Sequence, residues 1–64
     1  MKFHVPAMNC GHCIAAIANG ISSLDPDATV QTDLQTRTVT VTSDRSAVQI
    51  AAAIKSAGYD ATLA

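Results

Sequence analysis

The chain has 64 residues, of which 48% are hydrophobic and 14% are charged, and its formal net charge is −1. This composition predicts one small folded domain over residues 1–64 and, with two aromatic residues and no basic stripe, excludes a disordered chain and argues against nucleic-acid binding. No apolar run approaches the ~20 residues of a membrane-spanning helix and no signal segment precedes the first polar residues, so we expect a cytoplasmic protein with no membrane insertion.

The first predicted elements are a strand and a helix. The segment KFHVP alternates apolar and polar residues, which predicts a half-buried strand that ends at Pro6 because proline has no N–H to donate. From His12 or Cys13 onward, isoleucines and a leucine recur at steps of three and four, which predicts a helix that ends before Pro26. Gly20 inside this helix is expected to weaken it by about 1 kcal/mol relative to alanine.

The middle of the chain predicts a hairpin. Ala28–Leu34 and Arg37–Thr42 are both rich in β-branched residues that alternate with polar ones, as in paired antiparallel strands. A short turn is expected at Gln35 and Thr36. The two valines of the second strand are expected to face the core, with its threonines toward solvent.

The last third predicts a second helix and a short strand. Ser43 or Asp44 is expected to cap the helix, and Gly58 is expected just after its C-terminus. The segment YDATL then predicts a strand with Tyr59 and Leu63 on one face. The order is βαββαβ, and IAAIANGISSLDPDATV in the first half resembles IAAAIKSAGYDATL in the second. We therefore predict an α+β, ferredoxin-like sandwich, with two helices on one face of a four-stranded antiparallel sheet.

Cys10 and Cys13, the only cysteines, lie in the stretch AMNCGHCIAAI at the junction between a loop and the first helix. In a cytoplasmic protein such a pair is more often metal-binding or catalytic than a structural disulfide. A spacing of three at a helix start points both sulfurs the same way, and the helix N-terminus favours thiolate over thiol. Two convergent thiolates suit a soft ion such as Cu(I), whereas structural zinc requires four ligands. Such a two-thiolate site stays open to a partner's thiolate.

The cysteine pair has two other interpretations. A thioredoxin-like redox dithiol needs a longer chain, an aromatic residue and a cis-proline against the cysteines, and none can be placed here. The pair as two small buried hydrophobic residues does not account for the spacing at a helix start.

The motif MNCGHC matches the signature MxCxxC. Together with the βαββαβ order over essentially the whole chain, it makes the sequence resemble the heavy-metal-associated (HMA) domain family, and within it the bacterial CopZ-type copper chaperones. The family usually has glycine before the methionine, where this chain has Ala7. The resemblance implies that Cys10 and Cys13 are the metal ligands, that Met8 is buried beneath the loop, and that Tyr59 lies near the site.

Three of the residues around the cysteines have competing interpretations. Met8 has a thioether that is able to bind Cu(I), but packing in the core is the preferred interpretation. His12 is an exposed residue with no role, a group near the thiolates, or a third ligand to a neighbouring molecule's metal. Tyr59 is a core aromatic, a shield for the metal, or both.

The function implied by the resemblance is a soluble Cu(I)-binding metallochaperone that passes copper by ligand exchange to a copper-transporting P-type ATPase. We do not expect an enzyme, because no nucleophile–base pair or paired carboxylates converge on a pocket. The alternatives are a carrier or detoxification protein for Hg(II), Zn(II) or Cd(II), and a metal-sensing interaction module. The expected oligomeric state is a monomer without metal, with a metal-bridged dimer at high loading.

Overall fold

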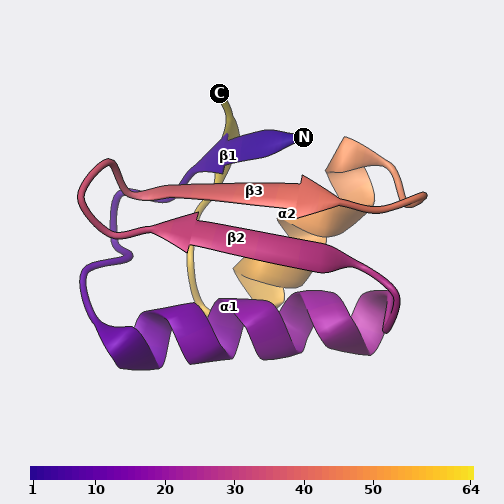
Figure 1. Ribbon diagram of the computed structural model, residues 1–64, viewed down its shortest axis with the longest axis horizontal. Coiled ribbons are helices and arrows are strands. Elements are labelled where there is room, and N and C mark those ends of the chain that lie inside the picture. The colour runs from indigo at the N-terminus through magenta and orange to yellow at the C-terminus, as the bar shows by residue number, and fades with distance from the viewer.

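The computed structural model describes residues 1–64 as two helices and one sheet of four strands (Figure 1). Neither helix is long and apolar enough to cross a bilayer. In chain order the elements are β1 (Lys2–His4), α1 (Gly11–Leu24), β2 (Thr29–Asp33), β3 (Thr38–Thr42), α2 (Ala47–Ser56) and β4 (Thr62–Leu63).

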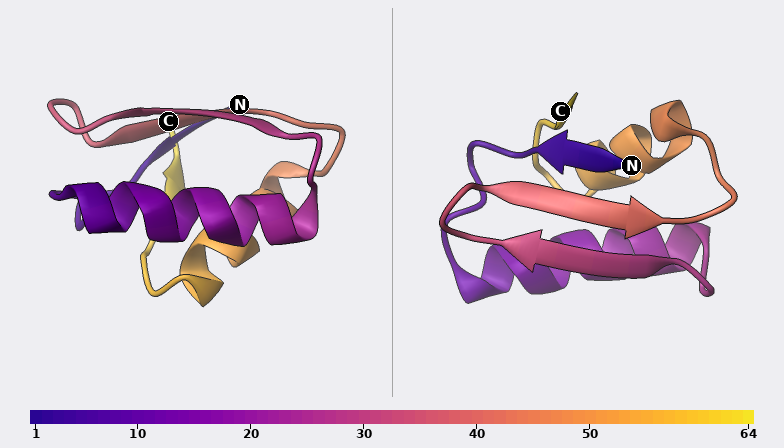
Figure 2. Two further views of the ribbon diagram at one scale, coloured as in Figure 1. Left: turned by 60° about the horizontal axis from the view of Figure 1, so that its bottom comes forward. Right: turned by 45° about the horizontal axis from the view of Figure 1, so that its top comes forward.

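All strand pairs are antiparallel, and the strand order across the sheet is β2-β3-β1-β4. Both helices lie on the same side of this sheet (Figure 2). The predicted α+β, ferredoxin-like sandwich is thus confirmed. The register pairs Phe3 with Val39 and Val30 with Val41, so the apolar residues of neighbouring strands point to the helix-covered face.

The core consists of ten buried side chains between the sheet and the helices. Because a chain of this length buries only about 60% of its unfolded surface, each of these residues matters for stability. The sheet supplies Phe3, Val39 and Val41, the two helices supply Cys13, Ile17, Ile21, Ile50 and Ile54, and Val5 and Met8 come from the segment that joins β1 to α1.

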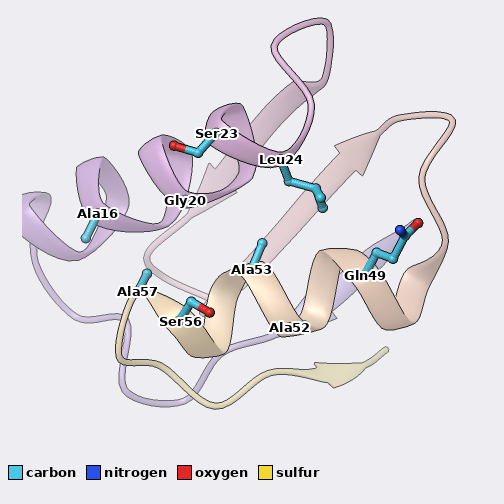
Figure 3. A pocket seen from close by; sticks show the side chains of 9 residues that line it. All are labelled: Ala16, Gly20, Ser23, Leu24, Gln49, Ala52, Ala53, Ser56 and Ala57. Carbon is cyan, nitrogen blue, oxygen red and sulfur yellow. The ribbon is translucent and has the colours of Figure 1, made fainter.

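The close packing of the two helices explains the glycine within α1. A Cβ atom at Gly20 would lie 3.0 Å from the Ala53 carbonyl oxygen on α2, so a side chain there would push the helices apart. A groove of about 600 Å³ runs over this crossing, lined mostly by small side chains of both helices (Figure 3). Neither cysteine lines it.

The β2–β3 connection differs from the predicted two-residue turn, because it comprises the four residues 34–37. Asp33 ends β2 early, since its Oδ1 accepts hydrogen bonds from the backbone N–H groups of Gln35 (2.9 Å) and Thr36 (3.3 Å). The chain returns to β3 through Arg37, which has a φ of 56°.

The prediction that Ser43 or Asp44 caps the second helix was wrong. Ser46 is the N-cap of α2, and it forms a reciprocal capping box with Gln49. Ser43 instead donates a hydrogen bond to Asp25, which follows the end of α1.

The last strand is shorter than predicted. β4 consists of Thr62 and Leu63 only, so Tyr59 lies outside it. Leu63 is 65% exposed, although it pairs with the buried Phe3, and β4 lies at the edge of the sheet.

Candidate metal centre

The start of α1 positions the two cysteines. α1 begins at Gly11, one residue before the earliest predicted start, so Cys10 occupies the N-cap position and Cys13 lies in the first turn. The carbonyl oxygen of Cys10 accepts the first helical hydrogen bonds, from the N–H groups of Cys13 (3.2 Å) and Ile14 (3.4 Å). The Cys10 side chain makes no capping bond, so its sulfur is free for other contacts.

The two sulfurs meet at one point, 2.8 Å apart, and no disulfide joins them. Cys13 is fixed in the core and is only 5% exposed, whereas Cys10 is partly exposed at the end of the preceding loop. We call the segment Pro6–Cys10 the metal loop. The pair is therefore asymmetric, with one sulfur held by the helix and the other carried by the loop.

The electrostatic environment favours the thiolate form of Cys13. The hydrogen bond from Cys10, then one from the Tyr59 hydroxyl, then one from the Asn9 backbone lower the pKa of Cys13 from 9.0 to about 7, against a partly opposing effect of burial. The same contact raises the pKa of Tyr59, because the hydroxyl must keep its proton to donate to the sulfur. At neutral pH a substantial share of Cys13 is thus in the thiolate form, which is the form of cysteine that binds metals in proteins.

Tyr59 reaches this position through the C-terminus of α2. Gly58 has a φ of 101°, a conformation that favours glycine, and it follows the C-cap residue Ala57 as predicted. The N–H groups of Gly58 and Tyr59 bond back to the carbonyls of Lys55 (2.9 Å) and Ile54 (3.3 Å), as in a Schellman motif. The sharp reversal places Tyr59 against the core, and its hydroxyl influences the pKa of Cys13.

Replacing Tyr59 by Phe is expected to raise the pKa of Cys13 above about 7, because a hydrogen bond to the thiolate is lost. Alkylation of Cys13 at neutral pH should then slow down, as followed by mass spectrometry across a pH series. In the unmodified protein the folded-state pKa is depressed, so stability without metal should rise with pH between about 7 and 9.0. An unchanged alkylation midpoint in the variant would show that Tyr59 does not act on the sulfur.

Met8 and His12 differ in their exposure to solvent. Met8 is fully buried and belongs to the core, as the packing interpretation predicts. His12 is exposed. No group of three or more His, Cys, Asp or Glu side chains is arranged to hold an ion, so His12 does not complete a three-ligand site with the cysteines of its own chain.

One residue beside the metal loop was not expected from the sequence. Arg37, at the end of the β2–β3 turn, donates from Nη1 to the carbonyl oxygen of Pro6 at 3.0 Å, and its own carbonyl accepts from the N–H of Val5 at 2.8 Å. An arginine in a turn without glycine or asparagine gives no sequence signal for this contact, because it depends on the sheet bringing residues 31 positions apart together.

Comparison with known proteins places this geometry in a family. Residues 2–60 match the heavy-metal-associated domain. The chain belongs to that family. Its structure is similar to a copper-bound trimeric form of a variant of the copper chaperone Atx1 from Synechocystis PCC6803, with 37% identity, a TM-score of 0.94, and 97% of this chain and 98% of that chain covered.

Two further solved structures are similar to this HMA domain. A gold binding protein is 46% identical, with a TM-score of 0.91, over 95% of this chain and 94% of that chain. A CopZ metallochaperone is 29% identical, with a TM-score of 0.85, over 97% of both chains. No curated protein matches the sequence. The predicted resemblance to copper chaperones of this family is confirmed.

Proposed function

We propose that this HMA domain is a soluble Cu(I) chaperone that binds the ion through Cys10 and Cys13. The observation that carries the proposal is the convergence of two sulfurs, one with a pKa lowered to about 7, at a partly exposed loop. Soft thiolate ligands select Cu(I). The copper chaperones among the similar structures support the same conclusion.

The asymmetry of the pair favours transfer by ligand exchange. A partner's thiolate approaches from the side of Cys10, which is partly exposed, while Cys13 keeps the ion attached to the helix. The incoming sulfur forms a bond to Cu(I), a three-coordinate state is shared, and the bond to Cys10 breaks first. We propose a copper-transporting P-type ATPase as the acceptor, through its metal-binding domain or the opening of its transport path.

The number of ligands favours Cu(I) over the alternative cargoes Zn(II) and Cd(II), but not over Hg(II), which is a soft ion that two thiolates also suit. Structural zinc sites use four protein ligands, and this chain offers two cysteines with no third His, Cys, Asp or Glu arranged beside them. The similar gold binding protein indicates that this fold is not restricted to copper. The choice of metal therefore has to be tested directly.

The rest of the proposal follows from the same site. We propose that residues 1–64 form a single HMA domain that acts in the cytoplasm as a carrier and not as an enzyme. Without metal we expect a monomer. Because the sulfur of Cys10 is accessible, two copies that share copper across facing metal loops are expected at high loading.

An anaerobic competition titration tests the choice of metal. The protein is loaded with Cu(I) and then challenged with Zn(II) in about tenfold excess, and we expect Cu(I) to be retained because a two-thiolate site suits the softer ion. Bound metal is measured after desalting, with a chelator of known Cu(I) affinity as reference. Displacement of Cu(I) by Zn(II) under these conditions would contradict the proposal and favour a zinc carrier.

A further inference from the structure

Arg37 connects the β2–β3 turn to the metal loop by two hydrogen bonds. Its carbonyl accepts from the N–H of Val5 at 2.8 Å, and its guanidinium donates to the Pro6 carbonyl at 3.0 Å. The turn and the segment between β1 and α1 lie at the same end of the molecule in every view of Figures 1 and 2. Arg37 thus contacts the chain on both sides of the peptide bond where the loop begins.

The backbone of Arg37 is strained. It is the only residue other than glycine with a positive φ, at 56°. Glycine or asparagine adopts this conformation at much lower cost, so the turn would be more easily formed without arginine. The side chain is exposed and adds nothing to the core. What arginine supplies here, and glycine does not, is the charged hydrogen bond to Pro6.

The metal loop is anchored at both ends, by Arg37 at the Pro6 carbonyl and by the first helical hydrogen bonds of α1 at the Cys10 carbonyl. Beyond Pro6, the N–H of Met8 bonds to the Val5 carbonyl at 3.0 Å, and the Met8 side chain is fully buried. Cys10 follows, partly exposed and without a side-chain cap bond. The Cys10 side chain thus has no bond of its own to the helix backbone, and the contact at Pro6 is one of the two anchors that limit how far the loop shifts.

Metal binding requires this sulfur to move. Two metal–sulfur bonds of about 2.3 Å each set the sulfurs up to about 4.6 Å apart, whereas they are 2.8 Å apart in the structure. Cys13 is buried in the first turn of α1, so the sulfur of Cys10 has to move away from it when a metal binds. A loop anchored at its start limits that movement and keeps Cys10 near the ion once it is bound.

We propose that Arg37 is a positioning residue for Cys10: by holding the Pro6 carbonyl it restrains the metal loop and slows the release of Cu(I). This inference rests on the proposed function for the cargo, but the restraint itself is a property of the protein without metal. Its signature is a faster-exchanging loop without a loss of stability in Arg37→Gly, because glycine also relieves the backbone strain at the positive φ of residue 37.

The test compares Arg37→Gly and Arg37→Lys with the matched control Arg45→Gly, which removes the same charge from a residue outside these contacts. In Arg37→Gly we expect the amides of Met8, Asn9 and Cys10 to exchange at least about threefold faster without metal, while Ile21 is unchanged. Release of Cu(I) to a chelator should be about three- to tenfold faster. The midpoint of thermal unfolding should stay equal or rise.

Arg37→Lys should restore part of the protection, because an ammonium donates one hydrogen bond in place of the planar guanidinium. Loop exchange and copper release in Arg37→Gly that match the wild type would overturn the proposal. Equal acceleration in Arg45→Gly would also overturn it, because the effect would then come from net charge. A wild-type protein that binds no Cu(I) would refute the proposed function, while the exchange data would still decide the role of Arg37.

Discussion

Replacing Cys10 or Cys13 by Ser is expected to reduce the affinity for Cu(I) by more than about 100-fold, beyond the range seen when supporting residues of a metal site are lost. The hydroxyl of serine stays protonated at neutral pH and is a hard ligand, so it does not replace a thiolate toward a soft ion. Each variant retains one sulfur, and no other group in the chain is arranged beside it. The measurement is an anaerobic competition titration.

The two serine variants should differ in their effects on the remaining thiol and on the stability of the fold. Cys10→Ser removes one metal ligand but keeps a hydroxyl in place of the thiol that donates to Cys13, so the pKa of Cys13 should stay below 9.0. Cys13→Ser puts a hydroxyl into a position that is only 5% exposed and should also cost stability. Thermal unfolding of both variants separates the loss of a ligand from the loss of the fold.

His12→Ala is the matched control, because it lies between the two cysteines in sequence and is exposed. It should keep most of the affinity, with at most a modest pH-dependent effect. If a single-cysteine variant instead kept wild-type affinity, the dithiolate site would be refuted. The next ligands to test would then be Met8 and His12.

Much of the fold could be predicted because it follows from short-range patterns. The isoleucines of α1 recur with the helical period, and Ile17 and Ile21 are buried as that period requires. The alternation in β3 placed Val39 and Val41 on the core side, which the structure confirms. The convergence of Cys10 and Cys13 was also predictable, since both lie within one turn of a helix start.

The parts that were missed depend on contacts between distant segments or on choices among similar residues. Ser43, Asp44 and Ser46 are all good N-caps, and only the partner Gln49, three residues after Ser46, decides among them. The contact between Arg37 and the metal loop depends on the sheet topology, which no local pattern contains.

The position of Tyr59 could be predicted in part from the sequence, and in part it depends on contacts in the folded chain. Its place after Gly58 was predictable from helix-capping rules, and its proximity to the site was implied by the family resemblance. The direction of its effect on the pKa of Cys13 was not predictable from the sequence, because that effect depends on the tight reversal after α2. The reversal in turn needs the positive φ of Gly58.

Replacing Met8 by Ala is expected to destabilise the protein by about 2–5 kcal/mol, because a fully buried side chain is removed and a cavity is left. A domain of this size has a total stability of only about 3–5 kcal/mol from its core. Met8→Ala should therefore be largely unfolded or melt far below the wild type. Chemical denaturation monitored by circular dichroism gives the difference in unfolding free energy.

Met8→Leu separates packing from metal binding, because leucine fills a similar volume but has no sulfur. If Met8 acts only by packing beneath the metal loop, Met8→Leu should lose less than about 1.5 kcal/mol of stability and bind Cu(I) as tightly as the wild type. The structure favours this outcome, since the side chain is fully buried in the core cluster and has no exposed path to solvent. A stable Met8→Leu variant with clearly weaker Cu(I) binding would instead make the thioether a third ligand, and the two-thiolate description of the site would have to be replaced.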